Sequence, residues 1–149
     1  MRHFSIPLIL MLSLQTCLGQ GAFGDKEWYD SILRQKSLHR EDTSMVNVWN
    51  ELGNYHKFGR ADSSIYYSSK AFELSRSLKF IPGQLQALEN LALTNETLGN
   101  INRAIQINRE GIELSQGYND PYYQALFLTL LADDYTEIKN YRAALKLHR

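Results

Sequence analysis

Few residues of this sequence have side chains and spacings suited to catalysis. The histidines are His3, His39, His56 and His148. Nucleophilic catalysis requires a base beside the nucleophile and a third group that orients the base. The sequence contains no Gly-x-Ser-x-Gly, no phosphate-binding loop of the Walker type and no His-Glu-x-x-His. We therefore expect a binding protein and not an enzyme, with no catalytic residue, no cofactor and no metal site.

The tightest acidic group is Asp133 with Asp134, followed one turn later by Glu137. Adjacent residues on a helix project about 100° apart, so the two aspartates are poorly placed to share a proton or a metal ion. We expect solvated charge, with Asp133 and Asp134 on different sides of their helix.

Composition restricts the class of partner. The 149 residues are enough for one domain with a sizeable core, and 16 basic residues balance 16 acidic ones. Lysines and arginines are dispersed and form no basic stripe, so we expect no nucleic-acid partner. Cys17 is the only cysteine, so neither a disulfide framework nor a cysteine-based zinc site is available.

Residues 1–19 have the pattern of an export signal. Arg2 and His3 precede an apolar stretch, and Cys17 and Gly19 occupy the −3 and −1 positions of a cleavage site. The apolar stretch is shorter than the roughly 20 residues that span a bilayer. Lipidation at Cys17 is the alternative to simple cleavage. We expect export to the periplasm or cell envelope, with membrane association only through Cys17 or through a segment after residue 149.

The rest of the chain repeats itself, and this repeat predicts the elements that position any binding residues. One apolar motif, with its small residue at the end, recurs at intervals of 39 and 40 positions. It reads Trp49-x-x-Leu52-Gly53, Leu88-x-x-Leu91-Ala92 and Leu128-x-x-Leu131-Ala132. The second half of each unit repeats as well, with Gly59, Gly99 and Lys139 as one series and Ser64, Ala104 and Ala144 as another.

Each unit is predicted to contain two amphipathic helices, because its apolar residues follow the i, i+3, i+4 spacing. Gly99 supplies the turn between the helices of the middle unit, and Asp120 caps a helix that begins at Pro121. The link from Lys79 to Gly83 is expected to separate the first two units. The units are predicted at about 45–84, 85–124 and 125–149, the last incomplete. Residues 20–44 are predicted to contain an extra helix packed on the first unit, or a degenerate earlier repeat.

The motif Trp49-x-x-Leu52-Gly53-x-x-His56 resembles the signature of the tetratricopeptide repeat (TPR) family, with His56 in place of the usual tyrosine. The resemblance covers residues 45–149 and is closest to the family's subclass with 40-residue repeats. It implies an all-α fold, a right-handed superhelical solenoid of antiparallel helix pairs. The packing positions that it assigns are Trp49, Leu52, Gly53, Gly59, Leu88, Leu91, Ala92, Gly99, Ala104, Leu128, Leu131, Ala132, Tyr135 and Ala144.

The same resemblance implies a concave groove, lined by the first helix of each pair, that binds a protein or peptide. Some TPR domains hold a carboxylate with a clamp of lysines, asparagines and an arginine. Here Asn50, Leu126 and Leu130 occupy the positions of the clamp cations, so a basic or neutral ligand segment is expected. The predicted groove residues are Asn47, Asn50, Asn54, Lys57, Gln86, Glu89, Leu93, Glu96, Leu126, Thr129, Asp133 and Thr136.

An export signal ahead of 40-residue repeats resembles the periplasmic input region of Bacteroidetes-like sensor histidine kinases and related regulators. This resemblance implies a protein-interaction module that serves signal input. The alternative is a stand-alone scaffold, secreted or lipid-anchored, in assembly of the cell envelope.

Overall fold

The computed structural model describes residues 31–32, 34 and 42–147 of the chain. The predicted export signal, residues 1–19, and most of the predicted extra helix in residues 20–44 lie outside the described residues. The chain divides into two compact units, residues 1–37 and 38–149. The described part of the second unit is all-helical, as predicted. Its helices are α2 (Thr43–His56), α3 (Ala61–Ser77), α4 (Ile81–Thr97), α5 (Ile101–Tyr118), α6 (Pro121–Glu137) and α7 (Tyr141–Leu147).

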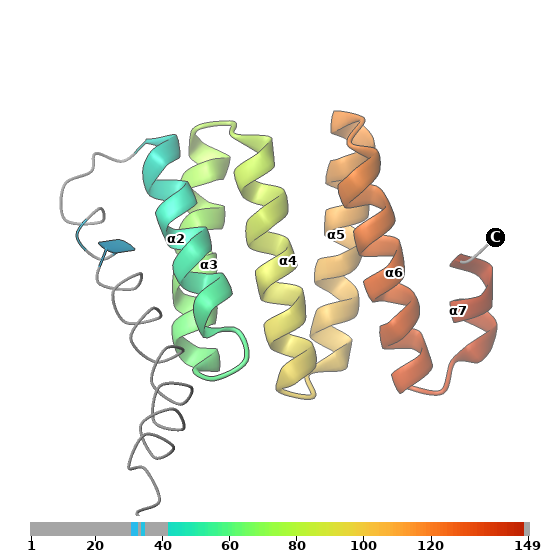
Figure 1. Cartoon of the computed structure of the whole chain (residues 1–149). Helices are drawn as coiled ribbons and strands as arrows, with labels where there is room; N and C mark the ends of the chain where they lie inside the picture. Colours follow the sequence, from blue (N-terminus) through green and yellow to red (C-terminus); the bar gives the residue numbers. More distant parts are fainter. Residues whose placement is uncertain (1–30, 33, 35–41, 148–149) are drawn as a thin grey trace, which may run out of the picture. The chain divides into compact units, whose positions relative to one another are not determined.

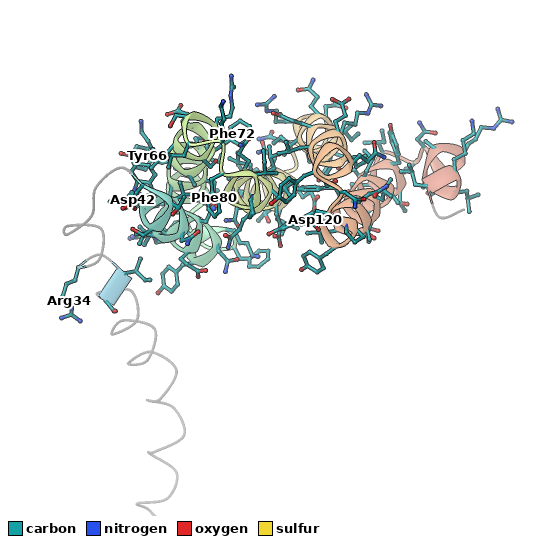
Figure 2. All side chains as sticks on the ribbon, turned by 90° about the horizontal axis from the view of Figure 1, so that it is seen from above. Arg34, Asp42, Tyr66, Phe72, Phe80 and Asp120 are labelled. Atoms are coloured by element: carbon teal, nitrogen blue, oxygen red, sulfur yellow. The ribbon has the colours of Figure 1, made fainter. Side chains whose placement is uncertain are left out.

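Consecutive helices run antiparallel to each other (Figure 1), and in chain order they can be grouped into pairs as α2 with α3, α4 with α5, and α6 with α7. Each helix packs against the next one in the chain. The first helices of successive pairs also contact each other, α2 with α4 and α4 with α6. Seen along the helices, α2, α4 and α6 lie on one side and α3 and α5 on the other (Figure 2). α4 begins at Ile81 and α6 at Pro121, about four residues before the boundaries predicted at 85 and 125.

Helix ends recur every 20 residues, at residues with a left-handed backbone. Lys79, Gly99, Asn119 and Lys139 have φ values of 54°, 73°, 59° and 60°. The residue after each one donates a backbone hydrogen bond five positions back, as in Asn100 N–H to the Asn95 carbonyl, 2.8 Å. This pattern closes a helix by satisfying its last carbonyl groups. Because the same type of helix end recurs every 20 residues, two successive helices take up 40 residues.

The turn between α2 and α3 differs from this pattern. Gly59 was predicted to be equivalent to Gly99, but it is not among the residues with positive φ. Its turn is closed by hydrogen bonds from the Gly59 and Arg60 amides to the His56 carbonyl, at 3.1 and 2.9 Å. Gly53 and Ser64 are 11 positions apart, whereas Ala92 and Ala104 are 12 apart. The first unit therefore has one residue fewer at this turn, which leaves no place for the left-handed residue.

The helix starts follow local capping chemistry. The Asp120 carboxylate accepts a hydrogen bond from the Tyr123 amide, 3.1 Å, and Pro121 is the first residue of α6, as predicted.

The predicted link from Lys79 to Gly83 is too long, because α4 already begins at Ile81. Gly83 lies buried in α4, where a Cβ would be 2.6 Å from the Val46 side chain. It is a contact point between α2 and α4.

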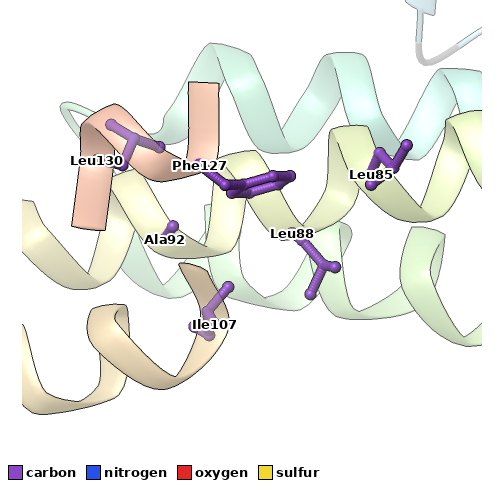
Figure 3. Close-up of a cluster of buried hydrophobic side chains, with 6 residues drawn as sticks. All are labelled: Leu85, Leu88, Ala92, Ile107, Phe127 and Leu130. Atoms are coloured by element: carbon purple, nitrogen blue, oxygen red, sulfur yellow. The ribbon is translucent and has the colours of Figure 1, made fainter. Parts of the chain in front are cut away.

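The largest core cluster joins α4, α5 and α6 around the fully buried Phe127 (Figure 3). Burying a phenylalanine side chain contributes about 1.5–3 kcal/mol. Its ring lies against Gly111, where a Cβ would be 2.6 Å from the ring atoms. Trp49, Leu88 and Leu128 were among the predicted packing positions. Leu88 is buried, but Trp49 and Leu128 are only partly buried, and Phe127 fills the centre instead.

Most of the other predicted packing positions are inaccessible to solvent. Tyr135 and Leu91 are half-buried, and Gly59 and Gly99 lie exposed in turns. The buried ones are Leu52, Gly53, Ala92, Ala104, Leu131, Ala132 and Ala144.

Candidate functional site

The predicted groove residues of α4 and α6 lie in two rows. Along α4 the positions 86, 89, 93 and 96 are spaced by three, four and three residues, so they share one helix face. Positions 126, 129, 133 and 136 repeat this spacing along α6. The α4 row is half-buried throughout, whereas the α6 row is exposed except at Leu126. Leu93 and Leu126 also pack against the core cluster, so the rows offer partly exposed apolar surface between polar groups.

Glu89 links the three first helices electrostatically. Burial raises the pKa of Glu89, and the charge of Lys57, just after α2, lowers it. Burial and the charge of Glu89 raise the pKa of Tyr123, on α6, to about 12. Lys57, Glu89 and Tyr123 therefore lie close enough to interact across α2, α4 and α6. Tyr123 was not among the predicted groove residues. Its position next to the capped start of α6 was the feature of the sequence that could have identified it.

The structure corrects the prediction for Asn50. Asn47 and Asn54 are exposed, but Asn50 is fully buried and does not line an accessible groove. Its amide donates to the Gly83 carbonyl, 3.0 Å, and the Asn90 amide donates to the Asn50 carbonyl, 2.9 Å. Asn50 and Asn90 thus hold α2 to α4. Their separation of 40 positions was the signal for a packing role.

The structure also corrects the prediction for Asp134. Asp133 is exposed, on a different side of α6, as expected. Asp134, however, is 2% exposed and is not solvated charge. The buried Asn108 side chain of α5 donates to Asp134 Oδ2 at 2.8 Å. A carboxyl group from α6 therefore enters the interface with α5.

Asp134 lies at the wall of a pocket between the end of α4, the start of α5 and the end of α6. The pocket has a volume of about 430 Å³ and is open to solvent on one side. We refer to it as the acidic pocket. Its lining residues are Glu96, Gly99, Ile101, Asp133, Asp134 and Glu137.

Burial and mutual repulsion disfavour negative charge in the acidic pocket. The pKa of Glu96 is raised to about 7, first by burial and then by the charge of Asp134, against a smaller lowering by the Asn108 amide. The pKa of Asp134 is raised to about 6, mainly by burial. Both carboxyl groups thus bind protons more tightly than they would in water.

Three oxygen atoms at this interface are buried without a hydrogen-bond partner. They are Glu96 Oε1, Asn108 Oδ1 and Asp134 Oδ1. A buried acceptor without a donor costs about 1–3 kcal/mol, so such atoms are uncommon in folded proteins. This set could not be predicted from the spacing of residues, because its members come from three helices and none stands 40 positions from another.

The remaining candidates for chemistry have packing roles. His56 is buried, its ring stacks on that of Tyr67 with the centroids 6.0 Å apart, and burial lowers its pKa. His56 thus packs between α2 and α3. In the described part of the chain, no three histidine, cysteine or acidic side chains are grouped so as to hold a metal ion. None of the helices described there has the length and apolar character needed to cross a membrane.

Comparison with models of known protein families and with characterised proteins finds no match to this sequence.

Proposed function

We propose that residues 45–149 form a protein-interaction module of TPR type, whose α2–α4–α6 face binds an extended segment of a partner protein. The observation that supports this most strongly is the direct contact of α2 with α4 and of α4 with α6. The predicted groove residues belong to these three helices or, for Lys57, directly follow α2. Such a continuous surface is the binding surface that stacked helix pairs present.

The chemistry of this face favours a segment that is basic or neutral and partly apolar. Glu89, Glu96 and Asp133 supply negative charge, and Lys57 is the one cation among the predicted groove residues. Leu93 and Leu126 supply half-buried apolar surface. A side chain with an apolar stem and a cationic end would match both features.

The binding face is tested by display of a random dodecapeptide library against the full chain, followed by anisotropy titration of the selected peptides. The groove variant is Asn54→Ala with Thr129→Ala, two exposed positions on α2 and α6. The matched control is Asp62→Ala with Gln106→Ala, exposed on α3 and α5. We expect about tenfold weaker binding for the groove variant and less than twofold change for the control. The opposite order, or no selectable peptide, contradicts the proposal.

We further propose that the module is exported and serves signal input in the periplasm. The support is the pattern of residues 2–19, together with the resemblance of export signal plus long repeats to sensor input regions. Fusion of residues 1–40 to an alkaline phosphatase without its own leader tests the export step, since this enzyme becomes active only after export. An inactive fusion, present at normal abundance, contradicts it.

A further inference from the structure

The acidic pocket gathers negative groups without a compensating cation. Four of its six lining residues are acidic and none is basic. The raised pKa of Glu96 has Asp134 and Asp133 among its causes, so the carboxyl groups oppose one another's ionisation. A bound cation would reverse this opposition by favouring the ionised forms. The charge of the pocket therefore selects a positive ligand.

A second, independent feature points to a ligand that donates hydrogen bonds. Asp134 is 2% exposed, lines the pocket and carries an oxygen, Oδ1, with no partner. Glu96 Oε1 is buried without a partner at the same place. When the two carboxyl groups are ionised, both atoms only accept. The missing partner is thus a donor, and two carboxyl groups on different helices require a donor with more than one N–H.

Size and donor geometry distinguish among cations. The pocket of about 430 Å³ is far larger than one water molecule, which occupies about 30 Å³. Its acidic groups are not arranged to hold a metal ion, within the described residues. A guanidinium group is planar, carries five N–H donors and no acceptor, and is more weakly hydrated than an ammonium group. A guanidinium group therefore loses less hydration than an ammonium group when it enters a half-closed site.

We propose that the acidic pocket is the seat of an arginine side chain, supplied by the partner segment that binds the α2–α4–α6 face. The guanidinium contacts Asp134 and Glu96 at the base of the pocket and Asp133 and Glu137 at its rim. Glu96 and Asp133 also belong to the predicted groove rows, so the pocket continues that surface. This inference rests on the proposed function and specifies one residue of its ligand.

The test is a titration of the full chain, labelled with ¹⁵N and ¹³C, with N-acetyl-arginine amide followed by nuclear magnetic resonance. Citrulline, lysine and MgCl₂ serve as comparison probes, the first two as N-acetyl amides. Citrulline has the shape of arginine without its charge. With the arginine amide we expect saturable chemical-shift changes at Gly99, Ile101 and Asp134 and a millimolar Kd. The lysine amide should bind at least fivefold more weakly, and the citrulline amide should not bind. We also expect saturation to lower the pKa of Glu96 by one unit or more.

Variants locate the binding. Glu96→Gln combined with Asp133→Asn keeps the shape of the pocket and removes two charges, so arginine binding should weaken at least tenfold. Glu113→Gln, an exposed acidic residue of α5, is the control and should bind within twofold of the wild type. Equal binding of arginine and citrulline, tighter binding of Mg²⁺ than of arginine, or an unaffected double variant overturns the proposal.

The two proposals fail in different ways. If displayed peptides bind the α2–α4–α6 face but the arginine amide produces no shift at the pocket, the arginine seat is wrong and the interaction module stands. If the arginine amide binds the pocket but no peptide binds the face, the cation site stands and its connection to a partner segment is wrong.

Discussion

The Asp134 carboxyl receives one hydrogen bond, from Asn108, and its other oxygen receives none. Packing alone does not call for such a group, because an apolar side chain of similar size would avoid the cost of burying it. At the residue scale, the buried carboxyl groups of the acidic pocket therefore lower the stability of the fold, and they form a set of hydrogen-bond acceptors that is in position before a ligand binds. Two predictions concern these residues.

The first prediction is that stability falls as pH rises through the pocket's titration range. The folded pKa values of Glu96 and Asp134, about 7 and about 6, lie above the ordinary values of 4.5 and 3.8. The folded state thus binds more protons than the unfolded state from about pH 4 to 8, and the destabilisation is complete at about pH 8. Glu96→Gln should be about 1 kcal/mol more stable than the wild type at pH 8 and equal to it at pH 4.

Urea unfolding monitored by circular dichroism at these two pH values measures the difference. Glu113→Gln is again the control, since this exposed residue lies outside the pocket. A Glu96→Gln variant that is equally stable at pH 8, or less stable than the wild type there, contradicts the electrostatic account of the pocket.

The second prediction concerns the donor to Asp134. Asn108→Leu keeps the side-chain volume but leaves the buried carboxyl without its hydrogen bond. We expect a loss of about 2–3 kcal/mol at pH 8, where Asp134 is ionised, and a smaller loss at pH 4.5. Thermal unfolding at both pH values measures it. Asn102→Leu, exposed on the same helix, is the control. A loss that is independent of pH would mean that packing, and not the hydrogen bond, is what the variant removes.

At the element scale, helix ends and small residues determine how the pairs fit together. Left-handed residues end α3, α4, α5 and α6 at intervals of 20 positions, and glycines admit large neighbours where helices meet. Gly111 and Phe127 are one such contact, between α5 and α6. Adding a single methyl group should therefore have its largest effect on stability at these contacts between helices.

The third prediction compares two glycines of α5. At Gly111 a Cβ would lie 2.6 Å from the Phe127 ring, whereas at Gly117 it would meet nothing within 4 Å. Gly111→Ala should destabilise by about 1–3 kcal/mol, because the buried ring must move. Gly117→Ala should stabilise by about 0.5–1 kcal/mol through helix propensity. Urea unfolding measures both. Equal effects of the two substitutions would show that α5 and α6 do not pack as described.

The repeat predicted the elements well, for a local reason. Caps and turns depend on a few neighbouring residues, so Asp120, Pro121 and Gly99 were interpretable from the sequence. The repeat gave less information about depth of burial. Asn50 and Asp134 were each assigned to the wrong environment, and Phe127 was not among the predicted packing positions, because their burial depends on side chains of other helices. Asn108 and Glu96 meet Asp134 through such contacts, and the acidic pocket was therefore not predictable from the spacing.

At the scale of the whole molecule, residues 42–147 form a row of packed helices with two different faces. α4 contacts both α2 and α6, and these three helices, with Lys57 just after α2, carry the predicted groove residues. α3 and α5 pack against them, with close approaches at small residues, such as Gly53 with Ser68 and Gly111 with Phe127, and with buried hydrogen bonds such as Asn108 to Asp134. A ligand segment is therefore expected on one face only.

Amide hydrogen exchange of the full chain, with and without a peptide selected by display, tests this central claim most directly. The account predicts slower exchange in residues 86–96 of α4 and 126–136 of α6 when the peptide is bound, and unchanged exchange in α3 and α5. Slower exchange confined to α3 and α5 would contradict it.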